Sequence, residues 1–131
     1  PGGWRAPGAK AMPAFAPPAA TLLQAAADDL ERDVLPALAG LPRYRVRIVL
    51  NVLRLVTREL EQGPAADAAE RERLVALLDG GDEALPELRA DLAARIERGE
   101  LPLDDPALLA HLTAGLREAL AIDSPSWAHE R

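Results

Sequence analysis

Residues 43–60 read RYRVRIVLNVLRLVTREL, and this stretch decides the fold class. Its apolar side chains recur every three to four residues, which is the period of an α-helix, and no segment of the chain shows the two-residue alternation of a half-buried strand. Five arginines and Asn51 interrupt the apolar residues, and the first acidic residue of the stretch is Glu59. We therefore predict a helix that combines a long apolar surface with a cationic side.

One side of this helix carries most of its positive charge. At 100° per residue, four arginines and one amide lie within about 80° of one another; these residues, the arginine stripe, are Arg43, Arg47, Asn51, Arg54 and Arg58. The opposite side carries Val46, Val49, Leu53, Val56 and Leu60, and a second apolar strip consists of Tyr44, Ile48 and Leu55. A helix that is apolar on two flanks usually packs on two sides. The stripe is therefore expected in a seam between helices or facing a partner.

Two roles are open for the arginine stripe. Guanidinium groups bind carboxylates and phosphates through paired hydrogen bonds, so the stripe can be neutralised within the molecule by Asp28, Asp29, Glu31, Asp33 and Glu59, or it can remain a solvated face. Alternatively, part of it docks an acidic protein surface or a phosphorylated ligand. For this second role we predict as partner-binding residues Arg43, Arg47, Asn51, Arg54, Arg58 and Glu59. Asn51 also has a structural alternative, a hydrogen bond to a neighbouring helix.

Two helical segments flank the stretch. The preceding one is predicted to begin at Thr21, where TLLQ has the spacing of a capping box, and to end at Pro36 and Gly40. Pro42 is placed to open the central helix, and Gly63–Pro64 is expected to end it. A short third helix follows, carried by Leu74, Val75, Leu77 and Leu78.

Two more helices are predicted in the C-terminal half. Asp82 is expected to cap the fourth, which ends at Gly99 and buries Leu85, Leu88, Leu92 and Ile96. Asp105 and Pro106 begin the fifth as N-cap and first helical residue, and its apolar stripe is Leu109, Leu112, Leu116 and Leu120. The predicted fold is all-α: an antiparallel bundle of about five helices with short loops and a disordered N-terminal tail.

Composition and charge narrow the function classes. At 131 residues the chain is expected to form one domain with one core. Its net charge of −6 argues against nucleic-acid binding. No apolar run reaches the length that spans a bilayer, and the absence of cysteine fits a reducing compartment. We therefore expect a cytoplasmic protein with neither nucleic acid nor membrane as partner.

The domain limits follow from the proline- and glycine-rich ends. Residues 1–18 are predicted to be a disordered tail, residues 19–127 the helical bundle and residues 128–131 a frayed end. Met12 is the single methionine of the chain, and we expect it to be the native start, with residues 1–11 not native.

The residues of common catalytic and metal sites are sparse. His111 falls off the leucine stripe of the fifth helix and is expected at the surface, and His129 falls in the frayed end. Ser124 and Ser126 have no base nearby in the sequence, and no glycine-rich nucleotide loop occurs. We therefore predict no catalytic residue, no metal and no cofactor, although residues converging from several helices could still form a small enzyme.

Three stretches resemble a family of small bacterial helical proteins known only as a domain of unknown function. They are VRIVLNVLRLVTRELEQGP, LRADLAARIERGEL and DDPALLAHLTAGLREALAIDSPSW, and the resemblance covers roughly residues 20–127. Arg58–Glu59 before Gly63–Pro64, and the block from RIERGEL to AIDSP, carry most of it. Family members often end in Asn-Pro and an aromatic residue, where this chain has Ser124 in place of the asparagine.

The resemblance implies a function that the helix pattern does not. Family members look like companions of aminoglycoside-phosphotransferase-like kinases and acyl-CoA dehydrogenases, and one resembles the small subunit of the levulinate-pathway hydroxyacyl-CoA kinase. It thus implies a non-catalytic accessory subunit that binds such a kinase in acid catabolism. The alternative is a self-associating helical protein with a structural or regulatory role and no kinase partner.

Overall fold

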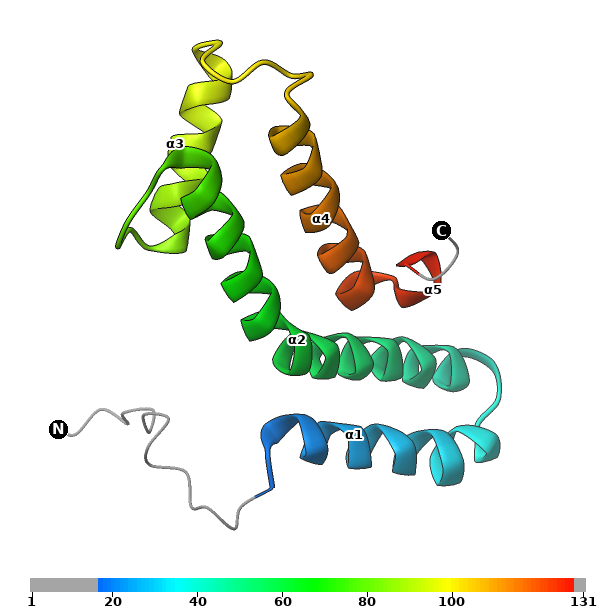
Figure 1. Ribbon diagram of the computed structural model, residues 1–131. Coiled ribbons are helices and arrows are strands. Elements are labelled where there is room, and N and C mark those ends of the chain that lie inside the picture. The colour runs from blue at the N-terminus through cyan, green and yellow to red at the C-terminus, as the bar shows by residue number, and fades with distance from the viewer. Residues whose placement is uncertain (1–16, 129–131) are drawn as a thin grey trace, which may run out of the picture. The chain divides into compact units, whose positions relative to one another are not determined.

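The computed structural model describes residues 17–128, and this range is helical with no strand (Figure 1). The all-α prediction is therefore confirmed. The chain divides into two compact units, one ending at Thr57 and the other beginning at Arg58. The single domain predicted over residues 19–127 is accordingly described below as two units. Residues 1–16, with Met12, and residues 129–131, with His129, lie outside the described range.

The first helix, α1, spans Ala19–Asp29 and begins earlier than the sequence predicts. Pro18 lies at the N-cap with φ −57°, and its carbonyl oxygen accepts the first helical hydrogen bond from the Leu22 amide at 3.2 Å. Thr21 therefore lies inside the first turn, and no side chain caps the helix. The predicted capping box is wrong, because the chain is already helical where the Thr21 hydroxyl would have to act as a cap.

The helical geometry changes twice after α1 ends. A π-helical turn, η2 (Leu30–Val34), continues α1, and a 3-10 turn, η3 (Leu35–Ala37), follows it. Pro36 lacks the amide hydrogen that a continuing α-helix needs, so the chain leaves the helix at the predicted position. Gly40 then adopts φ +63°, a left-handed conformation that glycine reaches without a Cβ penalty, and reverses the chain.

The second helix, α2, spans Gly40–Leu78 and merges two predicted helices. The expected break at Gly63–Pro64 is wrong, since Pro64 lies inside the helix. A proline there removes one backbone hydrogen bond, but the residues that follow, AADAAERER, are mostly strong helix formers. The described range therefore contains four helices of eleven residues or more instead of five, together with a single four-residue turn, α5 (Pro125–Ala128).

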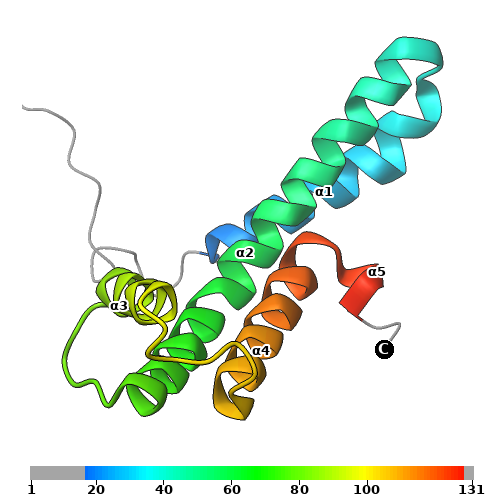
Figure 2. The same ribbon diagram turned by 90° about the horizontal axis from the view of Figure 1, so that it is seen from above.

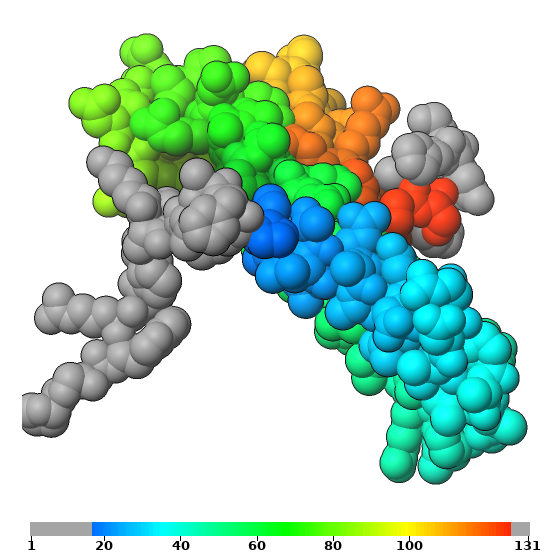
Figure 3. All heavy atoms as spheres, turned by 90° about the horizontal axis from the view of Figure 1, so that it is seen from below, coloured from blue at the N-terminus to red at the C-terminus, as the bar shows by residue number. Residues whose placement is uncertain are grey.

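The unit that ends at Thr57 is a helical hairpin of α1 and the N-terminal part of α2, which lie side by side (Figures 1 and 2). Its core consists of Ala27, Leu35 and Leu50, with Leu30, Val46 and Leu53 packed against it. Figure 3 shows the hairpin from the side of α1. Because alanine and leucine fill the interface, the two helices can pack closely along one face of α2.

The unit that begins at Arg58 packs the C-terminal part of α2 with α3 (Leu85–Glu97) and α4 (Pro106–Asp123). Its core consists of Leu74, Leu78, Leu88, Leu92 and Leu108. The predicted buried face of the fourth helix is confirmed: two of its members belong to this core, and Leu85 and Ile96 pack against it.

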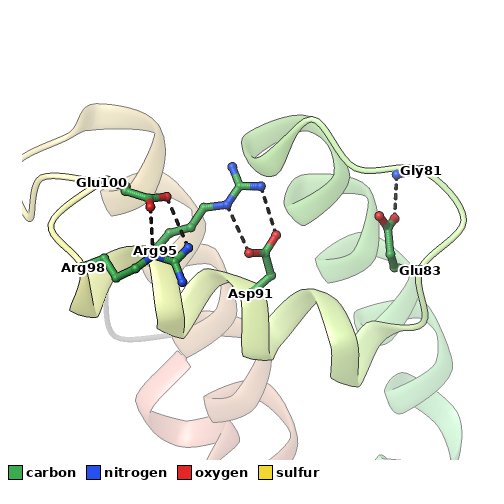
Figure 4. Close-up of polar contacts among 6 residues, drawn as sticks. All are labelled: Gly81, Glu83, Asp91, Arg95, Arg98 and Glu100. Carbon is green, nitrogen blue, oxygen red and sulfur yellow. Dashed lines mark hydrogen bonds and ion pairs between the residues drawn. The ribbon is translucent and has the colours of Figure 1, made fainter.

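The caps of this unit are partly as predicted. Asp105 accepts a hydrogen bond from the Leu108 amide at 2.9 Å with Pro106 at the first position of α4, which confirms that start. Asp82 does not cap α3, because Ala84 occupies that position; the carboxylate of Glu83 accepts instead from the Gly81 amide at 2.7 Å (Figure 4). Gly99 ends α3 with φ +75°.

Candidate functional site

Arg43, the first residue of the arginine stripe, holds the turn between α1 and α2. Its guanidinium donates to the carbonyl oxygen of Leu35 at 2.9 Å and to that of Leu38 at 3.5 Å. These carbonyl groups lie where the first helix ends, and helix-end carbonyls have no partner in the helix itself. Arg43 therefore stabilises the hairpin.

Arg54 joins the two helices of the hairpin. Its guanidinium lies 2.6 Å from a carboxylate oxygen of Glu31 and 3.2 Å from one of Asp28. The hydrogen bond to Glu31, with that to Asp28, raises the pKa of Arg54 above its ordinary value, so the guanidinium stays charged. A shallow hollow lined by Asp28, Glu31, Arg32 and Arg54 surrounds this contact. The charge of Arg54 is thus matched by acids of α1 and η2.

Arg58 makes its contact within the unit that it begins. Its Nε donates to the carbonyl oxygen of Ile122, near the C-terminal end of α4. Glu59, which we predicted either to neutralise the stripe or to bind a partner, is exposed and forms no ion pair among residues 17–128. Arg58 therefore ties α2 to the end of α4.

Two members of the arginine stripe are exposed to solvent. Arg47 and Asn51 are exposed, and so is Arg45, which helical spacing places away from the stripe. Within the described part of the chain none of the three takes part in a side-chain hydrogen bond or an ion pair. Two polar stripe members thus face solvent, while the other three arginines contact their own unit.

An apolar face lies beside these open side chains on α2. Four large side chains along it are between 44% and 63% exposed; they form the α2 apolar face, Leu41, Tyr44, Ile48 and Val52. Leu55 is half-buried. Beyond Arg45 on the helical wheel, Val49 and Val56 are exposed as well. The predicted second apolar strip is therefore present, but most of its side chains are exposed instead of packed against another helix.

The four leucines of the predicted apolar stripe of α4 are exposed. Leu116 is 66% exposed, and with Leu109, Leu112 and Leu120, all exposed, it forms the α4 leucine strip. Leu108, one residue before the strip begins, is fully buried and directs α4 onto the core. The helical period is present as predicted, but the five leucines from Leu108 to Leu120 together span about 120° of the helical wheel, and the pattern does not reveal which of them face inward.

His111 is buried, and its predicted surface position is wrong. The side chain is only 7% exposed, and its Nδ1 accepts a hydrogen bond from the Nε of Arg73 at 3.3 Å. Burial lowers the pKa of His111, and the positive charge of Arg73 lowers it further. The imidazole is therefore held in its neutral form. No sequence pattern indicates this pairing, because Arg73 lies on a different helix.

A cleft of about 170 Å³, lined by both charged and apolar residues, opens beside Arg73. Arg73 Nη2 lies 2.6 Å from Glu118 Oε1 without the alignment of a hydrogen bond, so this contact is electrostatic. Arg89 donates to Glu70 at 2.6 Å and 2.9 Å, and it holds the pKa of that carboxyl below its ordinary value. The arginines of the cleft are thus neutralised by its own acids.

Two further ion pairs of the second unit lie in α3 and just after it. Arg95 pairs with Asp91 at 3.1 Å, and Arg98 pairs with Glu100 at 2.8 Å (Figure 4). Among residues 17–128, no group of three or more histidines, aspartates or glutamates is placed to hold a metal ion. No helix in the same range is long and apolar enough to cross a bilayer.

Comparison with known proteins identifies the family. No curated protein and no solved structure matches the chain. The model of one family, described as a domain of unknown function (DUF6285), matches residues 36–127, which is more than half of the sequence. The match begins in η3 and extends through α2, α3 and α4 into α5. The chain therefore belongs to the DUF6285 family.

Proposed function

We propose that this protein is a docking subunit that acts by binding a larger protein and supplies no catalytic centre of its own. The observation that carries the proposal is the exposure of two ordered apolar surfaces, the α2 apolar face and the α4 leucine strip. Large contiguous apolar patches on a folded protein commonly mark interaction sites.

The size of these surfaces supports the proposal. Complete burial of one leucine, isoleucine or valine side chain stabilises by about 1.5–3 kcal/mol relative to full exposure. The eight side chains of the two surfaces are roughly half exposed on average, so covering them would contribute on the order of 6–12 kcal/mol before the costs of association. This contribution is of the same order as the cost of association, about 4–15 kcal/mol, and can therefore offset much of it.

The partner that we propose is a kinase of the phosphotransferase fold that phosphorylates hydroxyacyl-CoA substrates in acid catabolism. This choice rests on the resemblance of the stretches before Gly63–Pro64 and from RIERGEL to AIDSP to companions of such kinases. An acyl-CoA dehydrogenase is a further candidate partner on the same ground. The open residues Arg47 and Asn51 can contribute polar contacts to the complex.

Co-purification with the phosphotransferase-like kinase of the same organism tests the proposal, followed by ATP turnover on a 4-hydroxyacyl-CoA. We expect a stable complex, and turnover by the pair that neither protein shows alone. A kinase that does not associate with this protein and is fully active alone would overturn the kinase assignment.

The α4 leucine strip favours a second candidate function, self-association. In an antiparallel pair of α4 helices, Leu109 lies opposite Leu120 of a second copy, while Leu112 and Leu116 interleave at the centre. Arg117 is the single charged residue between Leu109 and Leu120 that lies near this strip on the helical wheel. A largely uncharged, self-complementary strip is suited to an isologous dimer.

Sedimentation velocity separates the two candidates. A self-associating protein should sediment as a dimer, and Leu116→Glu should shift it to the monomer. Leu103→Glu is a matched control, because Leu103 is 74% exposed but lies in the loop before α4. A monomer at all concentrations for the unchanged protein excludes the second candidate.

A further inference from the structure

The charged residues around the α2 apolar face are all positive. The chain has 21 acidic residues, yet none occurs from residue 34 to residue 58, where five arginines lie. Arg43, Arg54 and Arg58 contact their own unit. Arg45 and Arg47 are left exposed, and no acid of the described range pairs with them. The face is therefore apolar with uncompensated positive charge at its edges.

The spacing of the face is that of a helix-packing seam. Leu41, Tyr44, Ile48, Asn51 and Leu55 follow the alternating three- and four-residue steps of heptad positions a and d. Arg45 occupies the e position on one side, and Arg47 the g position on the other. Charges at e and g select the partner and its orientation, and a polar residue within the seam fixes the register.

From this arrangement we infer that the α2 apolar face binds an amphipathic helix of another protein, whose apolar stripe is flanked by aspartate or glutamate. Such a helix covers Leu41, Tyr44 and Ile48 and places its acids against Arg45 and Arg47. The inference rests on the proposed docking function and specifies the chemistry of the partner. Of the arginine stripe, only Arg47 and Asn51 belong to this binding surface. The other members of the stripe contact their own unit.

A second copy of the chain does not fit this face. In an antiparallel pair centred on Ile48, Arg45 and Arg47 of both copies gather around the two-fold axis with no acid between them. In a parallel pair Arg45 lies opposite Gly40 of the other copy and Arg47 opposite its Val52, so neither arginine meets an acid. Like charges at the edges of a helix seam oppose pairing, so the occupant must carry the opposite charge.

An anionic membrane surface also fits less well. Seating the face among lipids would leave the Asn51 amide without a partner in an apolar environment. The same hairpin carries Asp28, Asp29, Glu31 and Asp33 on α1 and η2, and anionic lipid repels this charge. A protein helix can instead offer hydrogen-bonding groups to Asn51.

Two synthetic peptides of about three heptads test the inference directly. Both carry leucine at a and d; one carries glutamate at e and g, and the matched peptide carries lysine there. Fluorescence anisotropy with the full chain should show the glutamate peptide binding at least about tenfold more tightly. Arg45→Glu/Arg47→Glu should reverse this preference without disturbing the core, since both side chains are exposed.

Control variants locate the binding surface. Ile48→Asp should abolish binding of the glutamate peptide, and Leu116→Asp on α4 should leave it within about twofold. Circular dichroism verifies that each variant is folded. Equal binding of the two peptides, no binding of the glutamate peptide, or loss of binding in Leu116→Asp alone would overturn the inference. So would Ile48-dependent binding to phosphatidylcholine–phosphatidylglycerol vesicles, or Ile48-dependent self-association, in place of peptide binding.

Repeating the kinase co-purification with these variants distinguishes failure of this inference from failure of the proposed function. A kinase complex that survives Ile48→Asp and the double arginine variant contradicts this inference and leaves the proposed function standing. Selective binding of the glutamate peptide without any kinase complex removes the kinase assignment, and the helix-docking face is then retained.

Discussion

At the scale of single residues, arginines of one stripe have different roles. Arg54 meets two carboxylates of the same hairpin, whereas Arg47, two turns earlier, meets none in the described range. The sequence predicts the shared face of these residues, because that depends only on helical spacing. It does not predict which of them pair, since pairing depends on the register between α1 and α2.

Replacement of Arg54 by glutamine should lower the free energy of unfolding of the hairpin by about 0.5–1 kcal/mol. The side chain is one-third exposed, so solvent screens its two ion pairs and keeps their contribution small. Arg47→Gln is the control, and it should leave the melting temperature unchanged. An equal fall in melting temperature in both variants would mean that the contacts of Arg54 add no stability.

His111 should make the protein less stable in mild acid. Its pKa in the folded protein is lower than the ordinary value of 6.5, so the unfolded chain binds its proton more readily. Stability from the neutral imidazole is complete above pH 6.5 and is lost as the pH falls from there through the lower pKa of the folded protein. Glu70 and Glu118, which raise the pKa, reduce the size of the effect.

Urea unfolding at pH 7 and at about pH 5.5 measures this dependence. Gln is the conservative replacement, because the side-chain oxygen of His111→Gln can still accept a hydrogen bond from Arg73. The loss of stability between the two pH values should be smaller in His111→Gln than in the unchanged protein. Identical losses would show that other groups carry the acid sensitivity.

At the scale of elements, helix ends can be predicted where a single residue determines the backbone. Gly99 ends α3 because the amides of Gly99 and Glu100 donate to the carbonyl oxygens of Ile96 and Arg95, a Schellman pattern that requires the left-handed conformation. The end predicted at Gly63–Pro64 is wrong, because a helix break there depends on the balance between one lost hydrogen bond and the helix propensity of the residues around it. The π-turn η2 has no sequence signal that we recognise.

Alanine substitutions at two glycines should therefore have opposite effects. Gly63→Ala places a Cβ in open space within a helix and should stabilise by about 0.5–1 kcal/mol. Gly99→Ala also meets no neighbouring atom, but φ +75° is strained for alanine, so this variant should be destabilised. Differential scanning calorimetry gives both signs, and stabilisation by Gly99→Ala would contradict the assignment of the cap.

At the scale of the molecule, two small leucine cores take the place of the one that we expected. The sequence predicts the total apolar content and most of the helices, but the division of that content between cores depends on contacts that no local pattern specifies. The same reason explains the exposed α4 leucine strip. Leucines on two sides of a helix become core or surface only when the neighbouring helices are in place.

Hydrogen exchange should distinguish the two cores. Leu50→Ala removes a buried side chain from the hairpin, and Leu74→Ala removes one from the unit that begins at Arg58. Each leaves a cavity that costs about 2–5 kcal/mol. Mass spectrometry should show faster exchange in α1 for Leu50→Ala and in α3 and α4 for Leu74→Ala. Uniform acceleration in both variants would mean that the two cores open together.

The core of the hairpin also has a consequence during protein synthesis. Ala27, Leu35 and Leu50 all precede Thr57 in the chain, so the contacts of this unit need no residue that the ribosome adds later. Local contacts of this kind form quickly. The hairpin can therefore close, with the α2 apolar face already in place, while α3 and α4 are still to be translated, and a partner helix can bind the nascent chain.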